Sequence, residues 1–327
     1  MCTAISVTVD DNYFGRNLDY EFSFGEKVII TTRNFKFNFR NGKKISKHFA
    51  IIGMGIENNS FPLYFDATNE AGLSIAGLNF PDNAEYMEKK DDMDNVASFE
   101  LIPWVLTQCK SVTDACKLLE NINITNESFN EKLPPSPLHW IIADKIETAI
   151  VEQTKNGVRV FRTPVGVLTN SPSFDIQMFN LTNYMSASAE DAKNDFSDKV
   201  VLKPYSRGMG GIGLPGDLSS ASRFVKTSFL KLNSVFGKTE KEVINHFFHI
   251  LYSVYHVRGA VKVGNKYEIT HYTSCCNTDK GIYYYTTHNN SQINAVSLFA
   301  ENLKADKLIC YNLISEQKIL FQNTRNE

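Results

Sequence analysis

Hydrophobic and polar residues alternate over the first twenty positions, and this period of two indicates β-strands. In residues 2–9 one row of side chains is bulky and β-branched, while the other row is small and begins at position 2. The turn-forming run Asp10-Asp11-Asn12 separates this strand from a second one over residues 13–20. The pattern therefore predicts that the side chain at position 2 faces open space and not the core.

Further strands and helices follow from the same reasoning, with a period near 3.6 for helices. Strands are expected over residues 27–32, 34–40, 139–144, 148–154, 158–162, 267–274, 281–287 and 293–298. Helices are expected through residues 99–106, from Ser111 or Thr113 to Leu119, and over about 219–236 and 239–256. Asn156-Gly157 is the strongest hairpin signal in the chain. This order predicts an α+β protein with helices packed on antiparallel sheets.

No internal repeat and no clean linker divides the chain. The Asn/Ser/Asp-rich stretch 186–198 and the charged run 88–94 are interpreted as surface loops or insertions. We therefore expect a single domain over residues 1–327.

Composition and charge are those of an ordinary globular protein, with 43% hydrophobic residues, 21% charged residues and a net charge of −2. Lys and Arg are scattered, which argues against a nucleic-acid-binding surface. No apolar run reaches the ~18–20 residues of a membrane span, and the first residues lack the features of a secretion signal. We expect a cytoplasmic protein with neither nucleic acid nor membrane as a partner.

The six cysteines show no pairing rhythm, so a disulfide scaffold is not expected. Cys275 and Cys276 are adjacent, and no C-x-x-C pair is present to indicate zinc or a dithiol redox centre. Most of these cysteines are expected to be reduced and buried.

Cys2 is the exception because it directly follows the initiator methionine. Removal of Met1 would leave a thiol and a free α-amine on one residue. Thiols and α-amino groups have ordinary pKa values of about 8.5 and about 8, so the two groups can exchange a proton near neutrality. Such a residue is its own nucleophile and base and needs no partner histidine. The plain alternative is that Met-Cys is an accident of the chain start.

Arg16 and Asp19 lie in the strand that should pair with the Cys2 strand. Arg16 could hold a thiolate or orient an acyl group, and Asp19 could accept a hydrogen bond from the terminal amine. The alternative is a surface ion pair. Because positions three apart in a strand point to opposite faces, both side chains reach one site only if the chain bends or bulges between them.

Asn79 and Asn170 each end an apolar, strand-like run, with a proline two residues later. An uncharged amide donor at such a position can stabilise a developing oxyanion without protonating it, which amide hydrolysis needs. Taken singly, each asparagine is more often an ordinary turn residue.

The glycine-rich stretch 208–216 lacks the Gly-Lys-Ser/Thr ending and the βαβ context of a nucleotide loop. It is better interpreted as a loop that leads into a helix capped by Ser219. Arg223, in the first turn of that helix, would then project toward a pocket, or else be a solvated helix charge.

His246, His249 and His256 share a broad face if residues 239–256 form one helix. His249 and His256 would lie about 10 Å apart along the helix axis, which is too far for one metal ion. Ordinary core or surface histidines are the better interpretation.

Several separated motifs, taken in order, resemble the choloylglycine hydrolase family over almost the whole chain, most closely its bacterial bile salt hydrolases. The motifs are Met1-Cys2-Thr3, Phe14-Gly15-Arg16-Asn17-Leu18-Asp19, Ala71-Gly72-Leu73 with Gly77-Leu78-Asn79-Phe80, Val167-Leu168-Thr169-Asn170-Ser171-Pro172, and the segment from Gly213 to Phe224. The later segments Tyr272-Thr273-Ser274-Cys275 and Lys280-Gly281-Ile282-Tyr283-Tyr284-Tyr285 extend the likeness.

This resemblance implies an N-terminal nucleophile hydrolase with a four-layer αββα core, a homotetramer, and no cofactor or metal. By motif match it assigns Cys2 as nucleophile and, through its α-amine, as base. It assigns Arg16 and Asp19 to orienting thiol and amine, Asn79 and Asn170 to the oxyanion hole, and Arg223 to completing the polar site.

The implied reaction is hydrolysis of glycine- or taurine-conjugated bile salts through a thioester on Cys2. Leu18, Tyr20 and Phe65 flank the catalytic motifs and are expected to line an apolar steroid pocket, although they are equally compatible with plain core residues. Penicillin V acylases use the same machinery on another amide; they typically carry tyrosine where this chain has Asn79, which favours bile salts.

Two other interpretations remain open at this point. One is a small-molecule binding protein in which Cys2 is masked or oxidised. The other is a histidine-assisted hydrolase that uses Cys275 or Cys276, for which the sequence provides no motif.

Overall fold

The first hairpin of the chain lies inside the first of two large antiparallel sheets. The computed structural model describes residues 1–323, so the last four residues of the expected domain, 324–327, lie outside it. Strands β1 (Cys2–Thr8) and β2 (Asn12–Tyr20) pair antiparallel, with Cys2 opposite Leu18. The other strands of this sheet are β14 (Val167–Leu168), β15 (Val261–Val263), β16 (Lys266–Asn277), β17 (Ile282–Thr287) and β18 (Asn290–Ser297). Their order is β14-β1-β2-β16-β17-β18, with β15 beside β16.

The second sheet has eight strands and is also antiparallel throughout. Its strands are β3 (Lys27–Thr31), β6 (Ile51–Asn58), β7 (Phe61–Asn69), β8 (Ser74–Asn79), β11 (Leu138–Ala143), β12 (Thr148–Thr154), β13 (Gly157–Arg162) and β19 (Leu308–Asn312). Their order is β13-β12-β11-β8-β7-β6-β3-β19. Two small pairs lie outside the sheets: β4 (Phe37–Asn38) with β5 (Lys44–Ile45), and the parallel pair β9 (Asp94–Ala97) with β10 (Ile122–Thr125).

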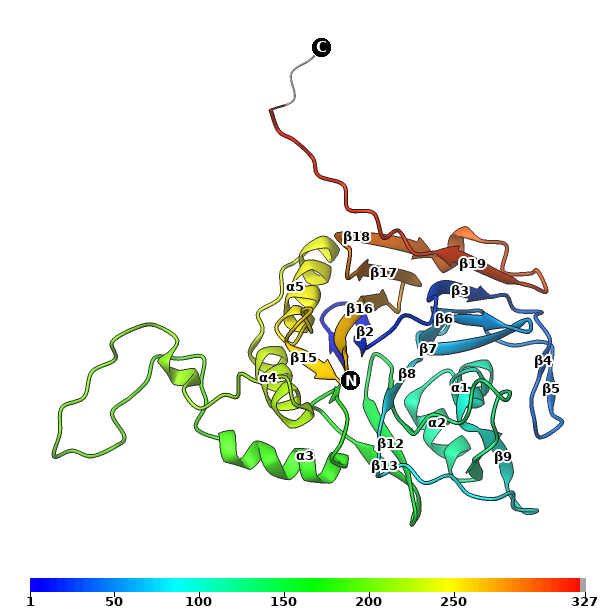
Figure 1. The fold of residues 1–327 in the computed structure, drawn as a ribbon, viewed down its shortest axis with the longest axis horizontal. Helices are drawn as coiled ribbons and strands as arrows, with labels where there is room; N and C mark the ends of the chain where they lie inside the picture. The colour runs from blue at the N-terminus through cyan, green and yellow to red at the C-terminus, as the bar shows by residue number, and fades with distance from the viewer. Residues whose placement is uncertain (324–327) are drawn as a thin grey trace.

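Helices cover the outer faces of the two sheets, which makes four layers (Figure 1). The helices are α1 (Leu101–Gln108), α2 (Val112–Leu119), α3 (Phe174–Leu181), α4 (Ser220–Asn233) and α5 (Glu240–Tyr252). Helices α4 and α5 pack beside the first sheet, and α1 and α2 beside the second. The predicted α+β class, with helices on antiparallel sheets, is confirmed.

Two apolar clusters follow this layering. One joins Ile5 and Phe14 of the first sheet to Ile141 of the second and to Phe247 of α5. The other packs the far face of the second sheet against Trp104 and Leu106 of α1. Burial of apolar area on both faces of each sheet supplies the main driving force for this arrangement. It also explains why β1 is buried on both of its faces from Cys2 to Val7.

Local sequence signals account for several element ends. The Ser111 side chain accepts the Asp114 N–H at the start of α2, and the Ser219 side chain accepts the Ser222 N–H at the start of α4. Gly15 in β2 is required by packing, because a Cβ there would lie 2.0 Å from the Ser274 carbonyl oxygen of β16. This close approach lets the two central strands pair next to Cys2.

Two expected elements were wrong, and so was the histidine face that depended on the second of them. Residues 34–40 form only the two-residue strand β4, which pairs outside both large sheets. The helix expected over 239–256 ends at Tyr252, because His256 instead accepts the Thr270 N–H of β16 and donates its own N–H to the Thr270 hydroxyl. His256 is therefore not on a helical face with His246 and His249. In addition, the sequence pattern did not predict α3 or the β6–β7 hairpin.

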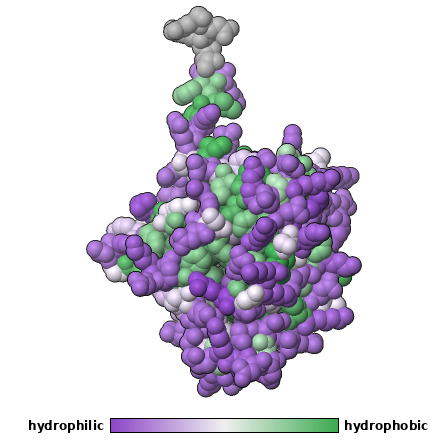
Figure 2. Space-filling model, turned by 90° about the vertical axis from the view of Figure 1, so that its right-hand side faces the viewer, coloured by the Kyte–Doolittle hydropathy of each residue, from purple (hydrophilic) through white to green (hydrophobic). Residues whose placement is uncertain are grey.

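The stretch between α3 and α4 projects far from the sheets as a long arm (Figure 1). It includes the predicted loop 186–198 and carries several exposed apolar side chains, namely Met185, Phe196, Val201, Leu202 and Tyr205. A second extended segment leaves the body after β19, and its exposed Ile319, Leu320 and Phe321 give it apolar character (Figure 2). Within residues 1–323 no helix is both long enough and apolar enough to cross a membrane.

Candidate active site

Cys2 begins strand β1 and lines a pocket whose walls come from both sheets. Only 4% of Cys2 is exposed, and the open space beside it is this pocket, which it shares with Arg16 and Asn79. The alternation of β1 places Cys2 on the face toward the second sheet and Thr3 on the face toward α4, where Arg223 contacts it. The sequence pattern therefore placed the thiol correctly beside open space, but the expectation that it lies outside the core was wrong, because Cys2 also belongs to the buried apolar cluster between the sheets.

Arg16 crosses from β2 to the second sheet. Its Nη1 donates to the carbonyl oxygens of Phe65 at 3.1 Å and Gly77 at 2.6 Å, and its Nε donates to the Asn17 carbonyl. Nη2 has no hydrogen-bond partner among the described residues, although Arg16 is fully buried and lines the pocket. Burial alone would lower the pKa of Arg16, but the thiol of Cys2 and the nearby hydroxyls and carboxyls outweigh it and raise the pKa. The charged Arg16 guanidinium therefore places an unpartnered N–H donor beside the Cys2 thiol.

Asp19 faces away from Arg16, toward the helices. Its Oδ1 accepts the Thr270 hydroxyl at 2.5 Å, and its Oδ2 lies 3.9 Å from Nε2 of His256. The backbone of Asp19, rather than its carboxylate, contacts Met1: the Met1 ammonium donates to the Asp19 carbonyl, and the Asp19 N–H donates to the Met1 carbonyl. The Asp19 carboxylate therefore has no direct hydrogen bond to the Met1 ammonium; its neighbours are Thr270 and His256.

The two faces of β2 remain distinct, as a regular strand requires, so no bend in β2 joins Arg16 to Asp19. The irregularity lies in the partner strand, where the register of β16 shifts between Thr270 and Tyr272 opposite Leu18 and Asp19. Arg16 therefore lies beside the Cys2 thiol in the pocket, whereas Asp19 bonds the preceding residue, Met1, through its backbone.

Asn170 holds that main-chain nitrogen. Its Oδ1 accepts the Cys2 N–H at 2.8 Å and an Arg223 N–H at 2.7 Å, and its Nδ2 donates to the Asn79 carbonyl at 2.6 Å. The two donors at Oδ1 fix the orientation of the amide. Asn170 thus links the start of β1 to the end of β8.

Arg223 lies in the first turn of α4, as the sequence predicted, and it is fully buried. Besides Asn170, its guanidinium donates to the Cys2 carbonyl, the Thr3 hydroxyl and the Leu218 carbonyl. Burial lowers the pKa of Arg223, while nearby Asp19 opposes that effect. Arg223 bonds the first two residues of β1, so it is not a solvated helix charge, but it does not line the pocket that contains Cys2.

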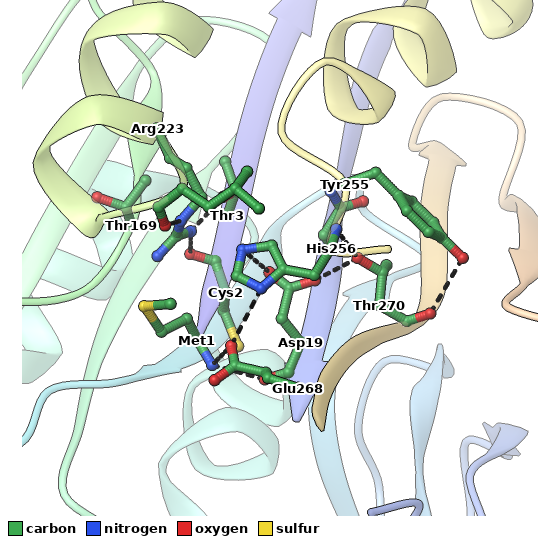
Figure 3. A network of polar contacts seen from close by, with 12 residues as sticks. Met1, Cys2, Thr3, Asp19, Thr169, Arg223, Tyr255, His256, Glu268 and Thr270 are labelled. Atoms are coloured by element: carbon green, nitrogen blue, oxygen red, sulfur yellow. Dashed lines mark hydrogen bonds and ion pairs between the residues drawn. The ribbon is translucent and has the colours of Figure 1, made fainter. Parts of the chain in front are cut away.

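The chain end lies in a second buried polar cluster (Figure 3). The Met1 ammonium pairs with the Glu268 carboxylate at 2.5 Å, and Nδ1 of His256 lies 3.4 Å from the same oxygen. Burial raises the pKa of Glu268, although the ammonium opposes it, and burial lowers the pKa of His256 to about 4. Sequence reasoning missed Glu268 and Thr270, and it interpreted His256 as an ordinary core or surface histidine without placing it near the chain end.

The pocket beyond Cys2 is largely apolar. Leu18, Tyr20 and Phe65 all line it, as do Phe24, Leu63, Phe99, Phe129 and Leu133 from segments that the sequence did not single out. Tyr20 and Phe65 both belong to an aromatic group centred on Phe24, with ring centroids 5.0 and 5.5 Å from the Phe24 centroid. Such a pocket suits a rigid hydrophobic ligand whose polar end reaches Cys2.

The other cysteines are poor candidates for a nucleophile. All six are free. Cys275 and Cys276 are buried, and burial raises the pKa of Cys275 far above its ordinary value and that of Cys276 to about 12. Among residues 1–323, no group of three His, Cys, Asp or Glu side chains is arranged to hold a metal ion.

A family model described as "Linear amide C-N hydrolases, choloylglycine hydrolase family" matches residues 2–311. The bile salt hydrolase/transferase of Lactiplantibacillus plantarum is 52% identical over 317 residues, which cover 97% of this chain and 98% of that protein. The conjugated bile acid hydrolase of Lactobacillus gasseri is 41% identical over 317 residues, covering 95% of this chain and all of that protein.

Solved structures agree with this likeness. The C2A mutant of the conjugated bile acid hydrolase from Clostridium perfringens superposes with a TM-score of 0.90 at 37% identity, covering 99% of this chain and 100% of that one. Penicillin V acylase from Agrobacterium tumefaciens gives a TM-score of 0.76 at 16% identity, covering 96% and 92% of the two chains, and so shares the fold.

Proposed function

The chain belongs to the choloylglycine hydrolase family of linear amide C–N hydrolases, and we propose that it hydrolyses the amide bond of glycine- or taurine-conjugated bile salts. The observation that carries this proposal is the position of Cys2, whose thiol lines an apolar pocket beside the unpartnered Nη2 of Arg16. A steroid suits the apolar walls, and its amide would then lie at the thiol.

The mature enzyme of this proposal lacks Met1. Hydrolysis of the Met1–Cys2 peptide bond converts the nitrogen now bonded to Asn170 into a free α-amine. That amine is a base, whereas the amide nitrogen is not. The space left by Met1 is bordered by the backbone of Asp19 and by the Glu268 carboxylate, both of which can accept hydrogen bonds from an ammonium group.

The reaction then runs in two halves. The α-amine takes the thiol proton as Sγ of Cys2 attacks the amide carbonyl carbon, and the tetrahedral oxyanion forms. The C–N bond breaks, the leaving amine takes the proton from the α-ammonium, and a thioester remains on Cys2. Water attacks the thioester, gives its proton to the α-amine, and the thiolate leaves and recovers that proton. The products are the free bile acid and glycine or taurine.

Asn79 and Arg16 are the groups best disposed toward the reacting carbonyl. Both line the pocket with Cys2, and no hydrogen bond occupies the Asn79 side-chain amide among the described residues. The Asn170 side chain already bonds Cys2, Arg223 and Asn79, which supports a role in holding the amine in addition to the proposed oxyanion contact. Asp19 supports the amine from behind through its backbone and its charge.

Penicillin V acylase activity is the second candidate, because the fold is shared with such an enzyme. The amide side chain of Asn79 and the aromatic wall formed by Tyr20, Phe24 and Phe65 favour a bile salt.

We also propose a cytoplasmic homotetramer. The projecting arm between α3 and α4 supports assembly, since it exposes Phe196, Val201 and Tyr205, each more than four-fifths accessible. Apolar side chains of this size on an extended arm are stabilised when another subunit covers them. Light scattering after size-exclusion chromatography measures the assembly directly.

Glycocholate, taurocholate and penicillin V, offered separately to the purified protein, test the proposal. We expect release of glycine and taurine at rates well above release of the penicillin V side chain. The Cys2→Ser variant is the matched control; it should retain the fold and lose at least about a thousandfold in kcat, because a hydroxyl is far less acidic than a thiol. Turnover of penicillin V alone would support the second candidate instead.

A further inference from the structure

His139, on strand β11, is fully buried between the two chain segments that carry Asn79 and Asn170. In the register of β11 against β8, Leu138 lies opposite Asn79 and His139 opposite Leu78. The residue therefore sits directly beside the end of β8, although it does not line the pocket that contains Cys2.

His139 contacts both segments through different parts of its ring. Its face stacks on Phe80, the residue after Asn79, with ring centroids 4.2 Å apart and the planes 8° from parallel. Its Nε2 lies 2.9 Å from the carbonyl oxygen of Thr169, the residue before Asn170. One imidazole ring thus ties together the neighbours of both asparagines.

The hydrogens on this ring follow from its partners. A carbonyl oxygen only accepts, so Nε2 must carry a hydrogen. Nδ1 faces Oε1 of Glu152 at 3.4 Å, and that oxygen also accepts the Phe174 N–H at 2.8 Å. Two acceptors cannot face each other in a buried site without cost, so a proton lies between Nδ1 and Oε1. Glu152 thereby sets the ring so that Nε2 points at Thr169.

We propose that His139, held by Glu152, is a positioning residue that sets the spacing of Asn79 and Asn170 around Cys2. The inference rests on the proposed amide hydrolysis, because that reaction needs donors at a fixed distance from the developing oxyanion. His139 touches neither the thiol nor the pocket; it acts through Phe80 and Thr169.

The stability of the fold does not explain why His139 and Glu152 are paired at this buried position. A buried pair of polar, ionisable side chains costs desolvation free energy that an apolar pair of similar volume avoids. Both side chains are completely inaccessible, so solvent does not offset that cost. Their directional contacts to the two asparagine segments provide a reason for the polar pair at this position.

A matched pair of substitutions separates the two ring nitrogens. In His139→Gln the side-chain amide nitrogen can occupy the place of Nε2 and keep the bond to Thr169, whereas in His139→Asn it can occupy only the place of Nδ1. Both replacement side chains are neutral, polar amides, so we expect them to change the free energy of unfolding by similar amounts. His246→Gln and His246→Asn are the controls, since His246 lies half-buried on α5 and contacts Ser234.

Three measurements apply to all four variants and the unsubstituted protein: kcat and KM for glycocholate, the rate of Cys2 alkylation by iodoacetamide, and amide hydrogen exchange over residues 76–80 and 167–171. Alkylation needs the thiol but forms no oxyanion. We expect His139→Asn to lower kcat at least about tenfold, with KM and alkylation within about twofold, and to speed exchange in both segments. His139→Gln should stay within about threefold in kcat.

Equal losses of kcat in His139→Gln and His139→Asn would overturn the proposal, as would an alkylation rate that falls in step with kcat. Unchanged exchange over both segments in His139→Asn would overturn it even without turnover data. If the proposed amide hydrolysis itself is wrong, the unsubstituted protein does not hydrolyse glycocholate. In that case the hydrogen-exchange measurement still decides whether His139 orders the two segments.

Discussion

The side chain of Asn170 accepts the main-chain N–H of Cys2 at 2.8 Å, although the two residues are 168 positions apart in the chain. This nitrogen becomes the α-amine once Met1 is removed. The same asparagine oxygen accepts an N–H of Arg223, and Arg223 in turn holds the Cys2 carbonyl. The base of the proposed reaction is therefore held in place by a charged clamp from α4 and an amide from the segment after β14.

Replacing Asn170 should damage catalysis more than folding. Asn170→Ala removes the acceptor for the Cys2 nitrogen and frees the Asn79 carbonyl, so kcat for glycocholate is expected to fall about a hundredfold. Steady-state kinetics measure this loss. Asn83→Ala is the control because Asn83 bonds Pro81 and Ser171 nearby and makes no contact with Cys2. Similar losses in both variants would contradict the assignment.

Asn79→Ala tests the oxyanion contact. The variant loses a donor that acts only when charge develops on the carbonyl oxygen, so kcat should fall about 10²–10³-fold while KM changes little. A rise in KM with kcat preserved would show that Asn79 binds the ground state instead.

Arg223 should contribute to stability as well as to activity. Arg223→Met removes a buried guanidinium that donates to four acceptors; the Cys2 carbonyl and the Thr3 hydroxyl lose a buried donor, while the Asn170 oxygen keeps only the Cys2 N–H. We expect the free energy of unfolding to drop by about 3–5 kcal/mol, measured by urea denaturation. Arg258→Met on the exposed loop after α5 should cost less than about 0.5 kcal/mol. Comparable costs at the two sites would contradict the clamp.

Much of this site could be predicted from the chain because its residues carry local signals. The strand alternation around Cys2 and the Ser219 cap before Arg223 are short-range patterns, and both appear in the structure where they were expected. The hairpin at Asn156-Gly157 was predicted for the same reason, and Ser111, one of the two starts considered for α2, is its N-cap.

The contacts that the sequence could not supply are all long-range. Glu268 reaches Met1 across 267 positions, and His256 meets Thr270 because the chain leaves α5 early to join β16. The β6–β7 hairpin was missed because Gly53 and Gly55 interrupt its apolar alternation; each glycine is required by close packing against β7. Helix α3 was missed because its apolar residues do not lie on one face: Ile176 and Phe179 are exposed, so the segment shows no amphipathic period.

The pH dependence of stability should report His256. Burial lowers its pKa to about 4, below the ordinary value of 6.5, so the unfolded chain binds more protons between these limits. The stability present above pH 6.5 is therefore lost as pH falls toward 4, by up to about 3 kcal/mol from this group.

Asp19, Glu268, Arg223 and the chain amine also face His256, so the test compares His256→Gln with the unsubstituted protein. Urea denaturation at pH 7.5 and 4.5 should show a smaller pH difference for the variant. A variant that loses as much stability as the unsubstituted protein over this range would exclude His256 as the source.

The most direct test of the central claim compares chains that differ only in Met1. The protein is expressed with and without an inhibitor of peptide deformylase, which leaves formyl-Met1 on the chain, and intact mass identifies each form. We expect the form that begins at Cys2 to hydrolyse glycocholate and taurocholate, and the form that keeps Met1 to be at least about a thousandfold slower, because its Cys2 nitrogen is an amide and not a base. Equal rates for the two forms would contradict the account.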